Sequence, residues 1–187
     1  GVVNVINGSG PKVGQLLCED KRVDMISFTG SNETGKQILQ YASKNVKKMT
    51  MELGGKSASL IFNDVDLDVA VNSSLTSIFL NQGQMCTGMS RIIDKAKAEG
   101  GKIICGGKIP DSLELKNGYF FEPTVLVDVS VHSHIFKEEV FGPVVLIHKF
   151  SGSDEAAALA NSVDFGLAAC IWSKDLFLAQ ELAGKIN

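Results

Sequence analysis

The sequence predicts an α/β protein with a largely parallel sheet. Short apolar segments, such as residues 2–6, 25–29 and 144–150, alternate with stretches of helical character along the 187 residues. This alternation is typical of βαβ units. Glycine-rich turns follow several apolar segments, where a strand would pass into a helix. Hydrophobic residues make up 44% and charged residues 21% of the chain, which is ordinary for a globular protein with a substantial core.

The first third of the chain predicts three strands and two helices. Pro11 suits the first turn of a helix, where its missing N–H group loses no hydrogen bond. Ser31 or Asn32 is a suitable N-cap for the second helix, because a short polar side chain accepts from the free N–H groups there. The expected strands are residues 2–6, residues 25–29 and a segment that ends at Glu52, and the expected helices are residues 11–17 and 33–45.

The remainder of the chain continues the pattern. Asp64, Asp66 and Asp68 crowd the start of a predicted helix, where carboxylates favour the positive end of the helix dipole, so we expect capping instead of metal binding. The expected strands are residues 59–62, 102–105, 120–127, 144–150 and 168–172, and the expected helices are residues 66–80, 92–99, 153–161 and a last one from Asp175.

Charge and hydropathy exclude several classes of protein. A net charge of −3 argues against a nucleic-acid partner, which usually requires a basic surface. No run of 18 apolar residues predicts a membrane span, and no basic segment followed by an apolar one predicts a signal peptide at Gly1. We therefore expect a soluble cytoplasmic protein.

The cysteines and histidines indicate neither a disulfide framework nor a metal site. The four cysteines are widely spaced, which favours reduced thiols. Three of them have apolar or small neighbours and are expected to be buried, namely Cys18, Cys105 and Cys170. The three histidines lack partners with ligand spacing and are expected in surface loops, namely His132, His134 and His148.

Cys86 differs from the other cysteines in its surroundings. It lies in the segment Asn-Gln-Gly-Gln-Met-Cys-Thr, and Glu52 lies 34 residues upstream in Met-Glu-Leu-Gly-Gly-Lys. A thiolate is a strong nucleophile, and a nearby carboxylate can take its proton or activate a water molecule. The pair is therefore a candidate for covalent catalysis. On the residues alone, a solvated Glu52 and a buried structural Cys86 remain the alternatives.

Two glycine-rich turns are candidates for binding a dinucleotide. Gly8 and Gly10 belong to a G-x-G-x-x-x-G segment, one residue longer than the usual fingerprint, so an ordinary strand-to-helix turn is an equal alternative. Gly30 and Ser31 form a second such junction, where backbone N–H groups and the helix dipole could receive a pyrophosphate.

These segments, together with Phe-Thr-Gly-Ser at residues 28–31 and Glu-Glu-Val-Phe-Gly-Pro at residues 138–143, resemble the aldehyde dehydrogenase superfamily over nearly the whole chain. The resemblance implies that the Cys86 thiolate attacks an aldehyde, that hydride passes to NAD or NADP, and that water cleaves the resulting thioester to a carboxylic acid. Glu52 would be the general base. The backbone N–H of Cys86 would stabilise the oxyanion.

The same resemblance implies a cofactor site and a domain organisation. Glu139 would hold the ribose beside the nicotinamide, and Phe141 would pack against the ring. Gly8, Gly10, Gly30, Ser31 and Leu53 would complete the cofactor site. Residues 1–53 would be the C-terminal part of the Rossmann-like dinucleotide-binding domain, and residues 54–187 an incomplete catalytic domain. A small aldehyde would be the substrate, and a homodimer or homotetramer the assembly.

A segment of the family pattern is absent between Arg91 and Ile92. Either the chain joins pieces of a longer protein, or it is an internally deleted fragment. In the second case it would be an inactive module for binding or assembly. A relative that passes the acyl group to coenzyme A is a further alternative, although the retained Glu52 favours hydrolysis.

Overall fold

The structure, a computed structural model, describes residues 1–87, 101–115 and 117–187. The chain divides into two compact units, Gly1–Gly54 and Gly55–Asn187. Helices alternate with short strands in both units. Three of the four strand pairings among these residues are parallel, so the predicted α/β class with a largely parallel arrangement is confirmed.

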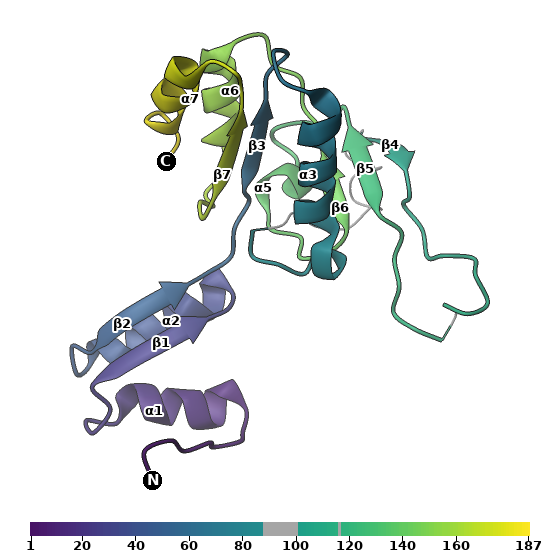
Figure 1. Cartoon of the computed structure of the whole chain (residues 1–187). Coiled ribbons are helices and arrows are strands. Elements are labelled where there is room, and N and C mark those ends of the chain that lie inside the picture. The colour runs from purple at the N-terminus through teal and green to yellow at the C-terminus, as the bar shows by residue number, and fades with distance from the viewer. Residues whose placement is uncertain (88–100, 116) are drawn as a thin grey trace. The chain divides into compact units, whose positions relative to one another are not determined.

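The first unit is built around one parallel crossover. Strand β1 (Met25–Thr29) is followed by helix α2 (Asn32–Ser43) and strand β2 (Lys48–Glu52). The two strands pair in parallel, and Thr29 lies opposite Glu52 at their carboxyl ends. Figure 1 shows them side by side with α2 behind them. All three elements were predicted from the sequence.

Local hydrogen bonds fix where these elements begin and end. The Ser31 hydroxyl accepts from the backbone N–H of Thr34 at 3.2 Å and caps α2, as predicted. At the far end of the unit the buried Lys47 ammonium donates to the carbonyl oxygens of Asp20 and Val23 at 2.5 and 2.6 Å. Lys47 thereby ties the segment before β1 to the residue before β2.

The strand predicted at residues 2–6 is wrong. The segment is irregular, and its apolar side chains are all exposed. A strand needs a neighbour to satisfy its N–H and C=O groups, and no strand in the described part of the chain pairs with it. The helix predicted next is present: a π-helical turn at Gly10–Gly14, with Pro11 in it, runs into α1 (Gln15–Glu19).

The second unit contains two small sheets. Strand β3 (Ala58–Ile61) pairs in parallel with β7 (Ala169–Trp172). Strand β5 (Thr124–Val127) is central in the other sheet, antiparallel to β4 (Lys102–Cys105) and parallel to β6 (Val144–Leu146). The helices that the structure describes in this unit are α3 (Leu67–Phe79), α5 (His134–Lys137), α6 (Ser153–Ala160) and α7 (Leu176–Ala183). Figure 1 shows α6 and α7 beside β7.

The core of the second unit lies between α5 and the sheet of β4, β5 and β6. Leu126, Val129, Ile135, Phe136 and Val144 form one buried cluster. Leu126 and Ile135 are fully buried. Because α5 supplies two of the five side chains, this four-residue helix is held in place by packing and not by its own length.

Strand β4 has the predicted bounds, β5 and β6 are shorter than predicted, and α5 was not predicted. Strand β5 begins only at Thr124, since Pro123 has no N–H group to donate to a neighbouring strand. Helix α5 begins where the Ser133 hydroxyl accepts from the N–H of Phe136 at 3.3 Å. The helix predicted at residues 92–99 lies outside the described residues.

Four side chains lie in surroundings other than those expected. His134 begins α5 instead of lying in a loop. Cys105 and Cys170 are exposed, although Cys18 is buried as predicted. Among the described residues, β4 and β7 are edge strands, each paired on one side only. His148 is not a surface loop residue. It is half-buried, and its ring meets that of Phe136 edge-on with centroids 4.8 Å apart.

The acidic residues before α3 have structural roles. Asp66 is the N-cap and accepts from the N–H groups of Asp68 and Val69 at 3.1 and 3.2 Å. Asp64 accepts from the Ser173 hydroxyl at 2.9 Å and from the N–H of Lys174 at 2.7 Å. Asp64 therefore joins the segment after β3 to the segment after β7.

None of the helices formed by the described residues has both the length and the apolar character needed to cross a bilayer.

The cap of α3 provides a test of this description. Asp66→Ala removes both capping hydrogen bonds, and we expect the free energy of unfolding to fall by about 1 kcal/mol. Asp68→Asn is the matched control, because Asp68 lies in the first turn without serving as the N-cap, and we expect it to stay within about 0.5 kcal/mol of wild type. Urea unfolding measures both variants. Equal losses would contradict the assignment of the cap.

Candidate functional site

Cys86 follows α3 after a turn with an unusual backbone. The turn spans Leu80–Gly83, and within it Asn81 and Gln82 have φ angles of 51° and 60°. Gly83 follows with a φ of 69°. Residues other than glycine rarely adopt positive φ, and such conformations gather at functional sites. The chain leaves the helix abruptly here and presents Cys86, whose side chain is half-buried.

Two glycines allow three distant segments to meet at this turn. A β-carbon on the buried Gly83 would collide with the carbonyl oxygen of Gly142. A β-carbon on Gly55 would collide with the carbonyl oxygen of Cys86 and would lie 3.1 Å from the side chain of Leu167. The segment of residues 80–86 therefore packs backbone-to-backbone against the segment after residue 54 and against the segment around residue 142.

Glu139 is held by the same arrangement. Its Oε1 accepts a hydrogen bond from the backbone N–H of Gly55 at 3.1 Å. Phe141, two residues later, has a φ of 60° and is half-exposed. A bulky residue with positive φ is a conformational outlier. The structure thus brings Cys86 and the segment of Glu139 and Phe141 together around Gly55.

Lys56 is a residue that the sequence analysis missed. Its side chain is buried, and its Nζ donates to the carbonyl oxygen of Ile135 at 2.8 Å. Burial lowers the pKa of Lys56 to about 8, and the charges of Glu138 and Glu139 limit the decrease. Its position directly after the two glycines of Glu-Leu-Gly-Gly-Lys was the only signal that could have pointed to it.

In the first unit four of the predicted residues lie at one edge. Glu52 ends β2, and its carbonyl oxygen accepts from the N–H of Gly30 at 3.0 Å. Ser31 caps the adjoining α2. The Leu53 side chain packs so closely on this helix that a β-carbon on Gly35 would lie 2.6 Å from it. The carboxyl edge of a parallel pair, next to a helix N-terminus, is where such folds bind ligands.

The predicted site residues therefore form two groups, one in each unit. The Glu52 side chain, Gly30 and Ser31 are exposed at the edge of the first unit. Gly8 and Gly10 are also in this unit, on the exposed segment that leads into α1. Cys86, Glu139 and Phe141 belong to the second unit.

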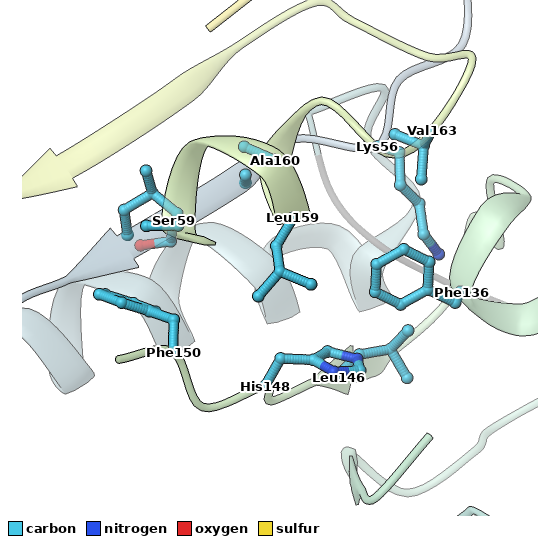
Figure 2. A pocket seen from close by; sticks show the side chains of 12 residues that line it. Lys56, Ser59, Phe136, Leu146, His148, Phe150, Leu159, Ala160 and Val163 are labelled. Carbon is cyan, nitrogen blue, oxygen red and sulfur yellow. The ribbon is translucent and has the colours of Figure 1, made fainter. Parts of the chain in front are cut away.

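A separate cavity lies between α6, β3 and the segment after β6. It has a volume of about 120 Å³ and a mostly apolar lining, including Leu159, Leu146 and Phe150. Figure 2 shows Lys56 extending toward the ring of Phe136 at one end, with His148 beside them. Burial lowers the pKa of His148, and its Nε2 is buried without a hydrogen-bond partner among the described residues. Cys86 does not line this cavity.

Metal-ligating side chains do not gather at either site. Within residues 1–87, 101–115 and 117–187, no group of three or more His, Cys, Asp or Glu side chains could hold a metal ion.

Comparisons with known proteins show which sequences this chain resembles. The betaine aldehyde dehydrogenase of Bacillus subtilis (strain 168) is 36% identical over 235 aligned positions, which include all of this chain and 48% of that protein. The 2-aminomuconic semialdehyde dehydrogenase of Mus musculus is 34% identical over 238 positions, with all of this chain and 49% of that protein covered. The chain thus spans about half the length of these curated relatives.

A solved structure shares the fold. The crystal structure of betaine aldehyde dehydrogenase from Staphylococcus aureus in complex with NAD+ matches 97% of this chain and 45% of its own, with a TM-score of 0.91 and 37% identity. The Bacillus alignment contains 235 positions, 48 more than the 187 residues here, in agreement with the segment predicted to be absent after Arg91.

The family model described as the aldehyde dehydrogenase family matches residues 1–93 and 89–187, and so includes every segment of the two groups of site residues. The chain belongs to the aldehyde dehydrogenase family.

Proposed function

We propose that the protein carrying this chain oxidises an aldehyde to a carboxylic acid with NAD+ or NADP+. The observation that carries the proposal is the packing of the Cys86 loop against Gly55 and the segment of Glu139, in a chain of this family. We infer that Cys86 is the nucleophile, that Glu52 is the base, and that the cofactor site comprises Gly8, Gly10, Gly30, Ser31, Leu53, Glu139 and Phe141.

In this mechanism the Cys86 sulfur forms a bond to the aldehyde carbon, and the carbonyl oxygen becomes an oxyanion that accepts from the backbone N–H of Cys86. Glu139 and Phe141 would hold the nicotinamide beside that carbon, and the bound cofactor would supply the acceptor for its hydride. The thiohemiacetal thereby becomes a thioester on Cys86. Glu52 then takes a proton from a water molecule, whose oxygen adds to the thioester carbon and releases the acid and the free thiolate.

The first unit is suited to a dinucleotide. Its exposed Gly30 and Ser31 lie where β1 passes into α2, and the N–H groups and dipole at a helix N-terminus favour a pyrophosphate. We infer that residues 1–53 belong to the cofactor domain and residues 54–187 to the catalytic domain. The S. aureus relative was crystallised with NAD+, which supports a nicotinamide cofactor here.

Substrate, location and assembly complete the proposal. The relatives are named for different aldehydes, so a small aldehyde is the substrate class that we infer. All four cysteines are unpaired, which suits a reducing compartment such as the cytoplasm. We also infer a homodimer or homotetramer from the family, and light scattering of the intact natural protein tests it.

Replacement of the nucleophile tests the central step. Cys86→Ala leaves no group that can form the thiohemiacetal, so we expect no aldehyde-dependent formation of NADH or NADPH, with binding of NAD+ or NADP+ retained. Cys170→Ala is the matched control, because that thiol is exposed on β7, and we expect normal turnover. Absorbance at the reduced-nicotinamide band measures activity, and calorimetry measures binding. Turnover by Cys86→Ala would overturn the assignment, and an inactive wild type would favour the binding-module alternative.

Replacement of the base separates the two halves of the reaction. Glu52→Gln cannot take a proton from water, so we expect steady-state turnover to fall by roughly 10²–10⁴-fold. An initial burst of reduced cofactor, of at most one molecule per active site, should remain, because hydride transfer precedes hydrolysis of the thioester. Glu114→Gln, a change of an exposed glutamate that belongs to neither group of site residues, should leave turnover unchanged. Stopped-flow absorbance distinguishes the phases. Unchanged turnover that requires coenzyme A would instead identify the acylating alternative.

The packing of Gly55 against Cys86 should also be required for activity. Gly55→Ala places a β-carbon against the carbonyl oxygen of Cys86, and a displacement of about 1 Å at a reacting group can lower the rate by about 10²-fold. Gly152→Ala is the control, since no atom lies within 4 Å of its added carbon. Measurement of kcat for both variants shows whether this packing is required for activity. Equal kcat values would show that the loop tolerates the added carbon.

A further inference from the structure

Lys56 is a charged residue whose side chain is buried. Its ammonium donates a hydrogen bond to the carbonyl oxygen of Ile135 at 2.8 Å. Burial of an ammonium disfavours its charged form, which is why its pKa is lowered to about 8. If Lys56 served only to pack the core, an apolar side chain of similar size would do so without the free-energy cost of burying an ammonium. The buried charge therefore indicates a role beyond packing.

The partner of Lys56 is the end of a helix. Helix α5 has only four residues, His134–Lys137, and the last carbonyl groups of any helix lack partners within it. The carbonyl of Ile135 is one of these, and a cation there also opposes the negative end of the helix dipole. Lys56 therefore satisfies a buried acceptor just before the acidic pair Glu138 and Glu139.

Two consecutive residues hold the two ends of this short stretch. The backbone N–H of Gly55 donates to Oε1 of Glu139 at 3.1 Å, and the Nζ of Lys56 donates to the carbonyl of Ile135 at 2.8 Å. The segment from Ile135 to Glu139 is thus attached at both ends to the residues that directly follow the first unit.

We propose that Lys56 is a positioning residue for Glu139, and that its positive charge sets the affinity of the site for the nicotinamide cofactor. The inference rests on the proposed function, in which Glu139 holds the cofactor ribose. Lys56 acts through Glu139 and the end of α5 and does not itself touch the cofactor.

The groups that face the Lys56 ammonium determine how the site responds to pH. Glu138 and Glu139 face it from the segment after α5, and both charges favour its protonated form. His148 faces the same cavity from the segment after β6, and burial lowers its pKa. The other residues that line this cavity from β3 and α6 carry no charge. The loss of charge above pH 8 is therefore assigned to Lys56.

The test uses Lys56→Met in the intact natural protein, with NAD+ and NADP+ titrated by calorimetry between pH 6.5 and pH 9.5. At pH 7 we expect the dissociation constant of the preferred cofactor to rise about tenfold, because a hydrogen bond from a charged group is lost. In wild type the dissociation constant should rise as the pH passes about 8, and in the variant this rise should be absent.

Thermal unfolding separates positioning from a structural role. The lowered pKa of Lys56 means that the folded protein disfavours its charged form, so the unfolded chain binds more protons between pH 8 and the usual lysine pKa. The free energy of unfolding of the wild type therefore rises with pH across this range. At pH 7 the ionised Lys56 side chain lowers that free energy. We expect the Tm of Lys56→Met at pH 7 to be no lower than that of wild type, although its cofactor affinity is lower.

Two controls complete the design. Lys56→Arg keeps a positive charge, and the adjacent cavity of about 120 Å³ gives its larger head group room, so it should retain affinity within about threefold and lose the rise above pH 8. Lys137→Met removes an exposed charge from α5 and should change neither affinity nor its pH dependence.

The possible failures are distinguishable. If Lys56→Met binds the cofactor as wild type does, or if its Tm falls and wild type shows no rise above pH 8, Lys56 is structural and the inference is overturned. If wild type binds neither nucleotide, the proposed function itself is overturned, and the inference with it.

Discussion

The absence of a side chain at Gly55 is the constraint on which the arrangement of the second unit depends. Its backbone lies against the carbonyl oxygen of Cys86, and its N–H donates to Glu139. Gly83, three residues before Cys86, makes a comparable approach to Gly142. Because backbone-to-backbone contacts leave no flexible side chain to absorb a shift, the thiol and the acidic segment hold their relative places as rigidly as the main chain does.

In the first unit the corresponding constraint is the register of two parallel strands. Thr29 lies opposite Glu52, so β1 and β2 end together, and the residues that follow them, Gly30 and Leu53, share one edge. The cap at Ser31 starts α2 at this same edge. A parallel crossover therefore collects exposed backbone N–H groups and a carboxylate in one place, although they are more than twenty residues apart in the sequence.

Features that depend on local sequence could be predicted, and those that depend on distant contacts could not. Ser31, Asp66 and Asp175 each cap a helix, and the nearby residues suffice to indicate this. Residues 2–6 have the composition of a strand but lack a partner in the described chain. Helix α5 exists because Ile135 and Phe136 enter the core. The burial of Lys56 and His148 depends on elements about eighty and ten residues away in sequence, so no local pattern marks it. The residues of the recognised motifs could be picked out from the sequence. The buried residues that pack beside them, such as Lys56 and His148, could not.

The turn before Cys86 is specified by torsion angles more than by contacts. Asn81 and Gln82 are exposed and have left-handed backbone conformations, which asparagine tolerates well and β-branched residues do not. Sequence drift at these two positions is therefore limited by which side chains permit positive φ, even though little packs against them. A valine or isoleucine at either position would remain exposed to solvent. It would nevertheless disfavour the positive φ angle, and so would favour a different backbone path before Cys86. The identity of two solvent-facing residues thus helps to determine where the Cys86 sulfur lies.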